Sequence, residues 1–409
     1  PLLDWRATLA SDGKLYVAYW FGDPGGDAGI RFQRSDDMGR TCTAPVSLVE
    51  RGDATHGVIA VRAIAANGSG RVALIYDEYW EGQHVFVLTS PDGGLTWNGP
   101  VRVDAGDTYG NGITGADLKV GSNGWVHAAF TQTRNVGAQV WYARSKDAGV
   151  TFEPEKNFDA VLGAGKRTGS GPPDVEIGND GSVLLTFWDN YSNDYVYVVR
   201  SANGGDSFTK TYSKSLNASD ATVLPRLWVA AGTNTLLLGW VRSDGALQVV
   251  RSADNGATFG TLQNLVTASA NTHRGVRTGT THWAIAWEDK RNAGLNAAFT
   301  DVYVRVSTDD GISYGVEQRA DRDPAGAHES RLAGLAASGS DNLFVAYQDT
   351  RPDGNSYNVW ANRSVAAPLD LSLNERRVDA DTWTDNVWQY GWPAVATDGA
   401  DHVYVAYAA

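Results

Sequence analysis

An eight-residue motif recurs six times along this chain, and its regular spacing constrains the fold more than any other feature of the sequence. The motif reads Ser-x-Asp/Asn-x-Gly-x-Thr/Ser followed by an aromatic residue, with Cys42 replacing the aromatic in the first copy. The copies begin at Ser35, Ser90, Ser145, Ser201, Ser252 and Ser307, so successive copies lie 55, 55, 56, 51 and 55 residues apart. A fixed period of this length indicates that one supersecondary unit is repeated.

The chemistry of the motif predicts a hairpin turn. A side-chain oxygen at the third position can accept backbone N–H groups across the turn, and the glycine supplies a positive φ angle. The third-position residues are Asp37, Asp92, Asp147, Asn203, Asp254 and Asp309, for which we predict a structural role. An alternating run precedes each copy, as at residues 140–144, and such runs are typical of strands. We expect the terminal aromatic to pack between adjacent sheets.

These motifs resemble the Asp box, or BNR repeat, of the sialidase superfamily, and the resemblance covers nearly the whole chain. It implies a β-propeller whose Asp boxes lie on the face away from the active site. In that family three arginines hold the substrate carboxylate, a tyrosine activated by a glutamate is the nucleophile, and an aspartate is the acid/base. The family's first arginine lies in an Arg-Ile-Pro-like motif, whereas no Arg-Ile-Pro occurs here and the one Arg-x-Pro triplet is Arg322-Asp323-Pro324 in the seventh repeat. The catalytic motif of the family is therefore not intact.

A second repeated unit, two apolar strands joined by a polar turn, precedes each box and occurs eight times. Its second strand ends near Tyr19, Tyr76, Phe130, Trp188, Trp240, Trp287, Tyr347 and Tyr407. We predict an all-β fold in which residues 1–409 form one β-propeller of four-stranded antiparallel blades, with no need for a helix. Eight blades are favoured, the last incomplete; the alternative is seven blades with the final hairpin packed elsewhere. Because the eighth unit stops after two strands, we expect a piece of a longer chain.

Composition limits the partners of the chain. The net charge of −13 opposes binding to nucleic acid and to anionic membranes. No apolar stretch approaches the ~18 residues needed to cross a bilayer, so we expect no membrane insertion. Cys42 is the only cysteine, which excludes an intrachain disulfide. No histidine, cysteine or acidic spacing matches a known metal motif, and we expect neither a metal nor a cofactor.

Charged residues are predicted to gather on the face opposite the Asp boxes, where the loops of a propeller converge on its channel. Alignment of the eight units places Arg6, Arg62, Asp117, Asp174, Arg226, Arg274, Arg331 and Pro393 near one position of the first strand. The candidate substrate-binding residues are Arg62, Arg226, Arg274 and Arg331, with Arg291 and Arg351 from neighbouring loops. Guanidinium groups could bind a carboxylate, sulfate or phosphate there. Alternatively, each arginine pairs with an acid of a neighbouring blade.

Acidic residues on the same loops are the candidates for catalysis. Asp289 and Asp349 follow second strands in Asp-x-Arg turns, and Glu329 and Tyr390 lie in loops that approach the same face. A carboxyl group kept protonated by burial could act as a general acid for glycosidic cleavage. The alternative is that each Asp-x-Arg turn only braces itself.

Two functions therefore stay open. The chain is either a non-catalytic module that binds a glycan or a protein, or an exo-glycosidase of sialidase type that acts on an acidic glycan. The absent Arg-Ile-Pro motif and the additional blades favour the binding module, whose sugar platforms would come from Trp80, Trp383, Trp388 and Tyr390. We expect a secreted or cell-surface protein that belongs to a larger assembly.

Overall fold

A computed structural model gives the structure of this chain. It describes residues 2–22, 28–37, 39–51, 57–79, 82–105, 112–134, 137–162, 171–189, 195–216, 224–293, 299–338, 341–351, 357–364, 371, 375–378, 394–397 and 403–406. The chain divides into two compact units, one of Pro1–Leu227 with Ala253–Phe259 and one of Trp228–Ser252 with Gly260–Ala409. Among the described residues, no helix is long and apolar enough to cross a membrane.

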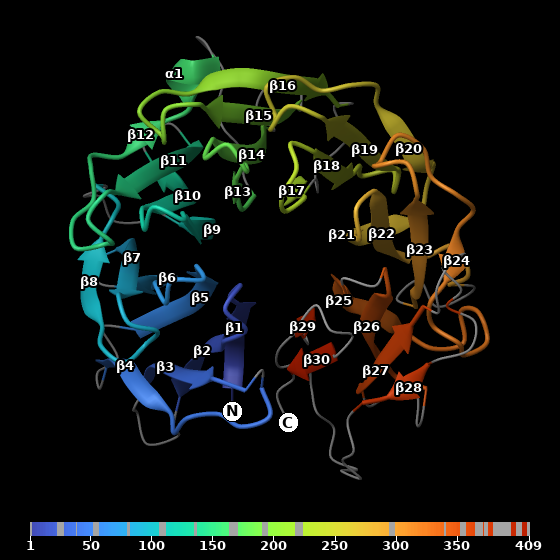
Figure 1. The fold of residues 1–409 in the computed structure, drawn as a ribbon, viewed down its shortest axis with the longest axis horizontal. Coiled ribbons are helices and arrows are strands. Elements are labelled where there is room, and N and C mark those ends of the chain that lie inside the picture. The colour runs from blue at the N-terminus through green and yellow to red at the C-terminus, as the bar shows by residue number, and fades with distance from the viewer. Residues whose placement is uncertain are drawn as a thin grey trace. The chain divides into compact units, whose positions relative to one another are not determined.

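The strands pair in chain order into antiparallel sheets (Figure 1). The first two sheets are β1 (Leu2–Leu9), β2 (Leu15–Gly22), β3 (Ala28–Ser35) and β4 (Val46–Arg51), then β5 (Gly57–Ala66), β6 (Val72–Tyr79), β7 (Gln83–Ser90) and β8 (Asn98–Arg102). The next two are β9 (Ile113–Val120), β10 (Val126–Arg134), β11 (Gly137–Ser145) and β12 (Lys156–Asn157), then β13 (Asp174–Ile177), β14 (Val183–Asp189), β15 (Tyr195–Ser201) and β16 (Thr209–Ser215).

The same order continues to the end of the chain. The following sheets are β17 (Arg226–Val229), β18 (Leu236–Val241), β19 (Leu247–Ser252) and β20 (Gln263–Val266), then β21 (Ala270–Thr278), β22 (His282–Asp289), β23 (Asp301–Ser307) and β24 (Gln318–Arg319). The last are β25 (Ser330–Ala337), β26 (Leu343–Asp349), β27 (Asn358–Arg363) and β28 (Arg376–Arg377), then the pair β29 (Ala394–Thr397) and β30 (Val403–Ala406). The described residues thus contain seven four-stranded sheets and one two-stranded sheet.

The predicted repeat is confirmed strand by strand. Seven of the eight predicted aromatics lie in second strands and are buried: Tyr19, Tyr76, Phe130, Trp188, Trp240, Trp287 and Tyr347. The eighth, Tyr407, lies outside the described residues. Eight sheets agree with the eight-repeat interpretation, while closure into one ring of eight or of seven blades stays a prediction.

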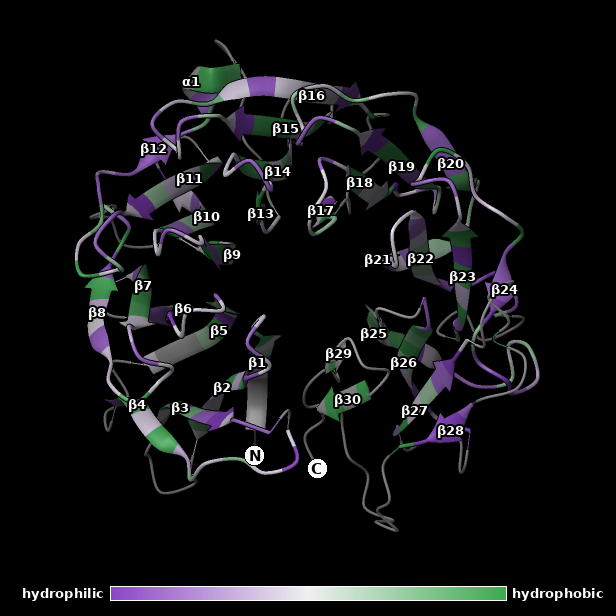
Figure 2. Cartoon of the chain, in the orientation of Figure 1, coloured by the Kyte–Doolittle hydropathy of each residue, from purple (hydrophilic) through white to green (hydrophobic). Residues whose placement is uncertain are grey.

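Neighbouring sheets within each unit pack face to face through apolar side chains. In the first unit, one buried cluster joins Phe32 of β3 to Leu74 of β6, and another joins Tyr142 of β11 to Phe187 of β14. The first strands β1, β5, β9 and β13 adjoin in that order, as do β21, β25 and β29 in the second unit. The outermost strands β16 and β28 are mostly hydrophilic (Figure 2). This is the arrangement of four-stranded antiparallel blades of the β-propeller class.

Each Asp box begins where a third strand ends, because β3, β7, β11, β15, β19 and β23 all stop at the serine of a box. In the box of β11, Ser145 Oγ donates to Asp147 Oδ1 at 2.7 Å, and the backbone N–H of Thr151 donates to the same oxygen at 2.9 Å. The Gly149 N–H donates to Ser145 Oγ at 2.7 Å. The fifth-position glycine of every box has a positive φ angle: Gly39, Gly94, Gly149, Gly205, Gly256 and Gly311. These hydrogen bonds and this backbone conformation form the turn.

The aromatic residues that end the boxes after β7 and β15 pack on the preceding sheet, as expected. Trp97 contacts Phe32 of β3 with 4.9 Å between ring centroids, and Phe208 contacts Tyr142 of β11 at the same distance. A box therefore closes its own hairpin and also fastens its sheet to the previous one.

One helical turn, α1 (Asp159–Leu162), departs from the expectation that the chain needs no helix. The Asn157 side chain accepts the backbone N–H of Asp159 at 2.6 Å, which caps the first turn. Phe158 is fully buried and anchors the turn against the third and fourth sheets.

Candidate functional site

The predicted first-strand position exists in the structure. Its seven described members all lie in first strands: Arg6 in β1, Arg62 in β5, Asp117 in β9, Asp174 in β13, Arg226 in β17, Arg274 in β21 and Arg331 in β25. Pro393 lies outside the described residues. The contacts of each side chain indicate whether the residue has a structural role or could bind a ligand.

In the first two sheets the arginines at this position bind the next first strand. Arg6 Nε donates to the carbonyl of Arg62 at 3.0 Å, and Arg62 Nη2 donates to the carbonyl of Ile113 at 3.4 Å. Arg62 also forms a bidentate ion pair with Asp77, which is fully buried, at 2.6 and 3.0 Å. The guanidinium group of Arg62 therefore has a structural role.

In the next two sheets carboxylates make the equivalent contact. Asp117 Oδ2 accepts the backbone N–H of Val175 at 2.9 Å, and Asp174 Oδ2 accepts that of Leu227 at 2.7 Å. Asp174 Oδ1 also accepts Arg226 Nη1 at 3.0 Å. Burial raises the pKa of Asp117. We call these contacts between successive first strands, with those of Arg6 and Arg62, the first-strand clamps.

Asp289 sits at the end of β22 and braces its own turn. It accepts the backbone N–H of Arg291 at 2.8 Å, Arg291 Nη2 at 2.5 Å and Trp287 Nε1 at 2.9 Å. Arg291 also pairs with Glu317. Hydrogen bonding to Asp289 is the main cause of the raised pKa of Arg291.

Asp349 repeats this pattern at the end of β26. It accepts the backbone N–H of Arg351 at 2.7 Å, Arg351 Nη2 at 2.6 Å and Ser330 Oγ at 3.0 Å. Arg351 also pairs with Glu375 at 2.7 Å. Both Asp-x-Arg turns thus have the self-bracing geometry that the sequence left open as one alternative.

A second group of charges gathers where β25 and β27 begin and β22 ends, all in the second unit. Tyr357 donates its hydroxyl to Glu329 Oε2, and Arg331 Nε donates to Glu329 Oε1 at 2.7 Å. The Arg331 guanidinium lies 4.7 Å from the centroid of the Tyr357 ring. Arg331 and Arg274 both act electrostatically on Glu288. We call these five residues the Arg331 cluster.

Glu288 is the buried acid of the Arg331 cluster. Its Oε1 accepts the backbone N–H of Leu332 at 2.9 Å, and its Oε2 accepts Asn271 Nδ2 at 3.1 Å. Burial raises its pKa, opposed by these two hydrogen bonds and by the nearby guanidinium groups. The bond to Leu332 connects the end of β22 to the next first strand, so Glu288 makes from a second strand a connection similar to a first-strand clamp.

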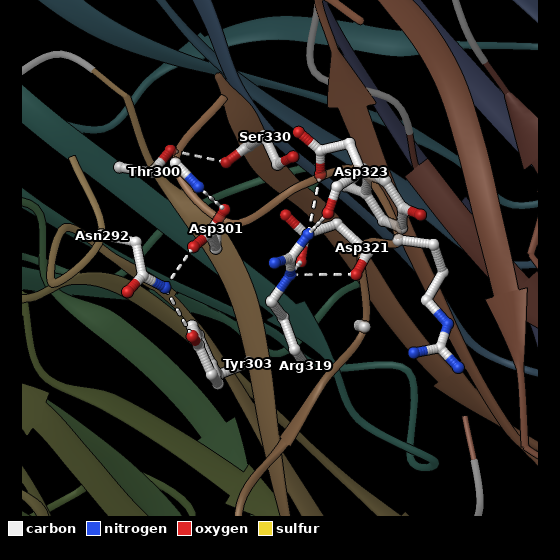
Figure 3. A network of polar contacts seen from close by, with 12 residues as sticks. Asn292, Thr300, Asp301, Tyr303, Arg319, Asp321, Asp323 and Ser330 are labelled. Atoms are coloured by element: carbon white, nitrogen blue, oxygen red, sulfur yellow. Dashed lines mark hydrogen bonds and ion pairs between the residues drawn. The ribbon is translucent and has the colours of Figure 1, made fainter. Parts of the chain in front are cut away.

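Four further carboxyl groups meet near the same strand ends. Asp301 begins β23, Asp321 and Asp323 follow β24, and Asp349 ends β26. The Arg319 guanidinium lies between Asp301 on one side and Asp321 and Asp323 on the other (Figure 3). Burial, reinforced by the charges of Asp301 and Asp323, raises the pKa of Asp321 to about 8. No pattern in the sequence indicated this group.

The structure brings together only part of the predicted site. Glu329, Arg331 and Arg274 belong to one cluster, whereas Arg62 and Arg226 belong to the first unit. Tyr390, the predicted nucleophile candidate, lies outside the described residues, as do Trp80, Trp383 and Trp388. The tyrosine that contacts Glu329 is Tyr357, which sequence reasoning missed although it directly precedes the third strand of the seventh repeat.

The fold and its six boxes define a repeat protein of the Asp-box propeller class. The family model described as "BNR repeat-like domain" matches residues 13–316, so the chain belongs to this family, whose fold is that of the sialidase superfamily. A search of curated protein sequences gave no match.

Solved structures with a similar fold include sialidases. The Hadza microbial sialidase Hz136 is 17% identical with a TM-score of 0.44, over 83% of this chain and 71% of that one. The intramolecular trans-sialidase from Ruminococcus gnavus is 12% identical with a TM-score of 0.45, over 85% and 90%. A Dyadobacter fermentans protein of unknown function is 11% identical with a TM-score of 0.45, over 76% and 95%.

Proposed function

We propose that this chain is a non-catalytic module that binds an acidic glycan at the Arg331 cluster. The observation that carries the proposal is the pairing of the other candidate arginines. Arg62, Arg226, Arg291 and Arg351 each form an ion pair with a carboxylate of the same chain. The carboxylate partners of these four arginines, Asp77, Asp174, Asp289 and Asp349, are buried, so these arginines hold the fold, whereas Glu329, the partner of Arg331, is partly exposed.

The Arg331 cluster itself suits an anionic ligand. Arg274 and Arg331 both act on Glu288, and Arg331 also pairs with the half-buried carboxylate of Glu329. Guanidinium groups can bind the carboxylate of a ligand, and Tyr357 adds an amphipathic ring of the kind that contacts sugars. Acidic glycans of this kind are displayed outside cells, so the proposal includes a secreted or cell-surface location.

Calorimetric titration with sialyllactose, lactose and a uronic-acid oligosaccharide tests the binding proposal. We expect the wild-type protein to bind an acidic glycan in preference to lactose, with no free monosaccharide released. Arg331→Ala should weaken binding at least tenfold. Arg242→Ala, which removes an arginine paired with the surface residue Asp244, is the matched control and should bind like the wild type. Equal affinity for lactose, or no binding to any acidic glycan, contradicts the proposal.

One observation favours a second candidate, an exo-glycosidase. A tyrosine hydroxyl bonded to a carboxylate, as in Tyr357 and Glu329, is the arrangement that activates a phenol as a nucleophile. Release of sugar from a sialoside by the wild-type protein, abolished in Tyr357→Phe while glycan binding persists, would establish the enzyme. An absence of turnover with intact binding supports the non-catalytic module.

A further inference from the structure

Three buried carboxyl groups of the second unit point to a ligand that the proposed function does not use. Asp301, Asp321 and Asp323 are 1%, 1% and 8% exposed. One oxygen from each lies within 4.8 Å of the oxygens of the other two. We call these three residues the aspartate cluster.

The charge of the aspartate cluster is not balanced by its hydrogen-bonding partners. Arg319 donates to Asp321 Oδ1 at 2.8 Å and to Asp323 Oδ1 at 3.0 Å. Among the described residues, Asp301 accepts hydrogen bonds from two neutral donors, Asn292 Nδ2 at 2.7 Å (Figure 3) and the backbone N–H of Gly326 at 3.1 Å. When all three carboxyl groups are ionised, they exceed the one guanidinium group by two negative charges. Buried charge without a counter-charge is strongly unfavourable.

His328 reduces this excess at most by one charge. Its Nδ1 lies 3.1 Å from Asp323 Oδ2. With all three carboxyl groups ionised and the imidazole protonated, one negative charge stays unbalanced in the cluster. A neighbouring guanidinium group, that of Arg351, is already shared by Asp349 and Glu375.

An unpartnered atom provides an independent indication. Asp321 Oδ2 is buried and has no hydrogen-bond donor of normal geometry among the described residues, because the nearby Ser330 hydroxyl donates to Asp349 Oδ2 at 3.0 Å. The Asp321 side chain is fully buried, and one of its oxygens is among the three that lie close together. A buried carboxylate oxygen is unfavourable when it has neither a well-placed hydrogen-bond donor nor a cation.

We infer that Asp301, Asp321 and Asp323 bind one calcium ion. Hard cations prefer carboxylate oxygens, and Ca²⁺–oxygen distances of about 2.3–2.6 Å place opposite ligands about 5 Å apart. The observed limit of 4.8 Å between the three oxygens fits one shared ion. Oxygens that already accept a hydrogen bond keep a lone pair for the metal.

The ion would fasten one sheet of the second unit to the next. Asp301 begins β23, whereas Asp321 and Asp323 lie in the connection from β24 to β25. A bond from each to one ion would fix the path along which the chain leaves one blade and enters the following one. Calcium would therefore stabilise this unit independently of any glycan.

Calorimetric titration of the EDTA-dialysed full chain with CaCl₂ tests the inference. We expect one equivalent of calcium to bind and the melting temperature to rise with calcium concentration. Asp321→Asn should weaken calcium binding at least tenfold and remove the calcium-dependent rise. Asp244→Asn, at an exposed aspartate paired with Arg242, is the matched control and should behave like the wild type.

A second variant, two other metal ions and a histidine variant ensure that the experiment can contradict the inference. If Asp321→Asn does not fold, Asp301→Asn and the calcium stoichiometry of the wild type replace it. Titrations with MgCl₂ and ZnCl₂ should give weaker binding than CaCl₂. Because His328, Asp323 and Asp349 also place ligand atoms within 4.8 Å of one another, zinc binding that exceeds calcium binding and is lost in His328→Ala would overturn the inference. No calcium binding by the wild type, or unchanged binding in both aspartate variants, would overturn it as well.

Discussion

The third residue of each Asp box performs one task with two different side chains. Asp147 accepts the backbone N–H of Thr151 at 2.9 Å and its hydroxyl at 2.6 Å. Asn203 accepts the backbone N–H of Ser207 at 3.0 Å, but its amide donates to the Ser207 hydroxyl at 2.9 Å. The hydroxyl is therefore a donor in the first box and an acceptor in the second. This difference shows that the turn requires an acceptor oxygen at the third position and not a negative charge.

Replacement of Asp147 tests this interpretation. Asp147→Ala removes the acceptor of two Thr151 hydrogen bonds and should lower the free energy of unfolding by about 1–3 kcal/mol. Asp147→Asn keeps the acceptor and should cost less than half as much. Urea denaturation of both variants measures the difference. Equal losses in the two variants would mean that the charge itself stabilises the turn.

Titration of His127 and of the box aspartates predicts acid sensitivity in two steps. Burial, aided by Arg144, lowers the pKa of His127 from 6.5 to about 4. Hydrogen bonds from the Thr151 side chain and backbone lower the pKa of Asp147 from 3.8 to about 2. In both cases the unfolded state binds more protons, so the stability is complete above the unfolded pKa and is lost as pH falls toward the folded pKa.

Stability should therefore decline first between about pH 6.5 and 4, because of His127, and further between about pH 4 and 2, because of the boxes. Urea unfolding at pH 7.5, 5 and 3 measures both steps. His127→Gln can still form a hydrogen bond with the Tyr142 hydroxyl. This variant should lose less stability than the wild type between about pH 6.5 and 4, and as much as the wild type below about pH 4. A constant free energy of unfolding from pH 7.5 to 5 in the wild type would contradict this assignment.

At the scale of the hairpin, four box glycines meet the preceding sheet: Gly94, Gly149, Gly205 and Gly311. Gly94 has a φ angle of +84°, and a Cβ atom added there would lie 2.3 Å from the Phe32 ring in β3. The same residue thus forms the turn of one sheet and makes room for the aromatic core of the previous one.

Gly94→Ala should consequently destabilise the chain by more than the ~1–2 kcal/mol of the left-handed backbone alone. Gly232→Ala is the matched control, because its φ angle is +73° and an added Cβ would meet nothing within 4 Å. Thermal unfolding of the two variants separates the steric contribution from the backbone contribution. Equal shifts in melting temperature would show that the Phe32 ring moves aside without a loss of stability.

Elements with a local signal were predictable from the sequence, and contacts between elements were not. The boxes and the second-strand aromatics depend on residues within one hairpin, so their pattern recurs in every repeat. The first-strand position was also recognised, but not whether its residues would bind a ligand or clamp the next strand. Tyr357 contacts Glu329 across 28 residues. Such a pair has no local pattern, and the same holds for the aspartate cluster.

The whole molecule carries a net charge of −13, and most arginines of the described candidate sites are already paired with acids. The protein therefore has little basic surface to offer a polyanion. We expect no complex with duplex DNA at 0.15 M salt in a gel-mobility assay, with a basic protein as positive control. A shifted band at that salt would reveal a local basic patch that dominates the global charge.

The first-strand clamps connect successive repeats. Arg62, Asp117 and Asp174 each bind the backbone of the next first strand, and Glu288 of β22 binds it from a second strand. A gene that encodes such a chain can duplicate or delete one repeat, and every surviving blade still finds the partner that it needs. The architecture is thereby tolerant of changes in copy number, which gives descendants of such a gene a simple route to propellers of different size.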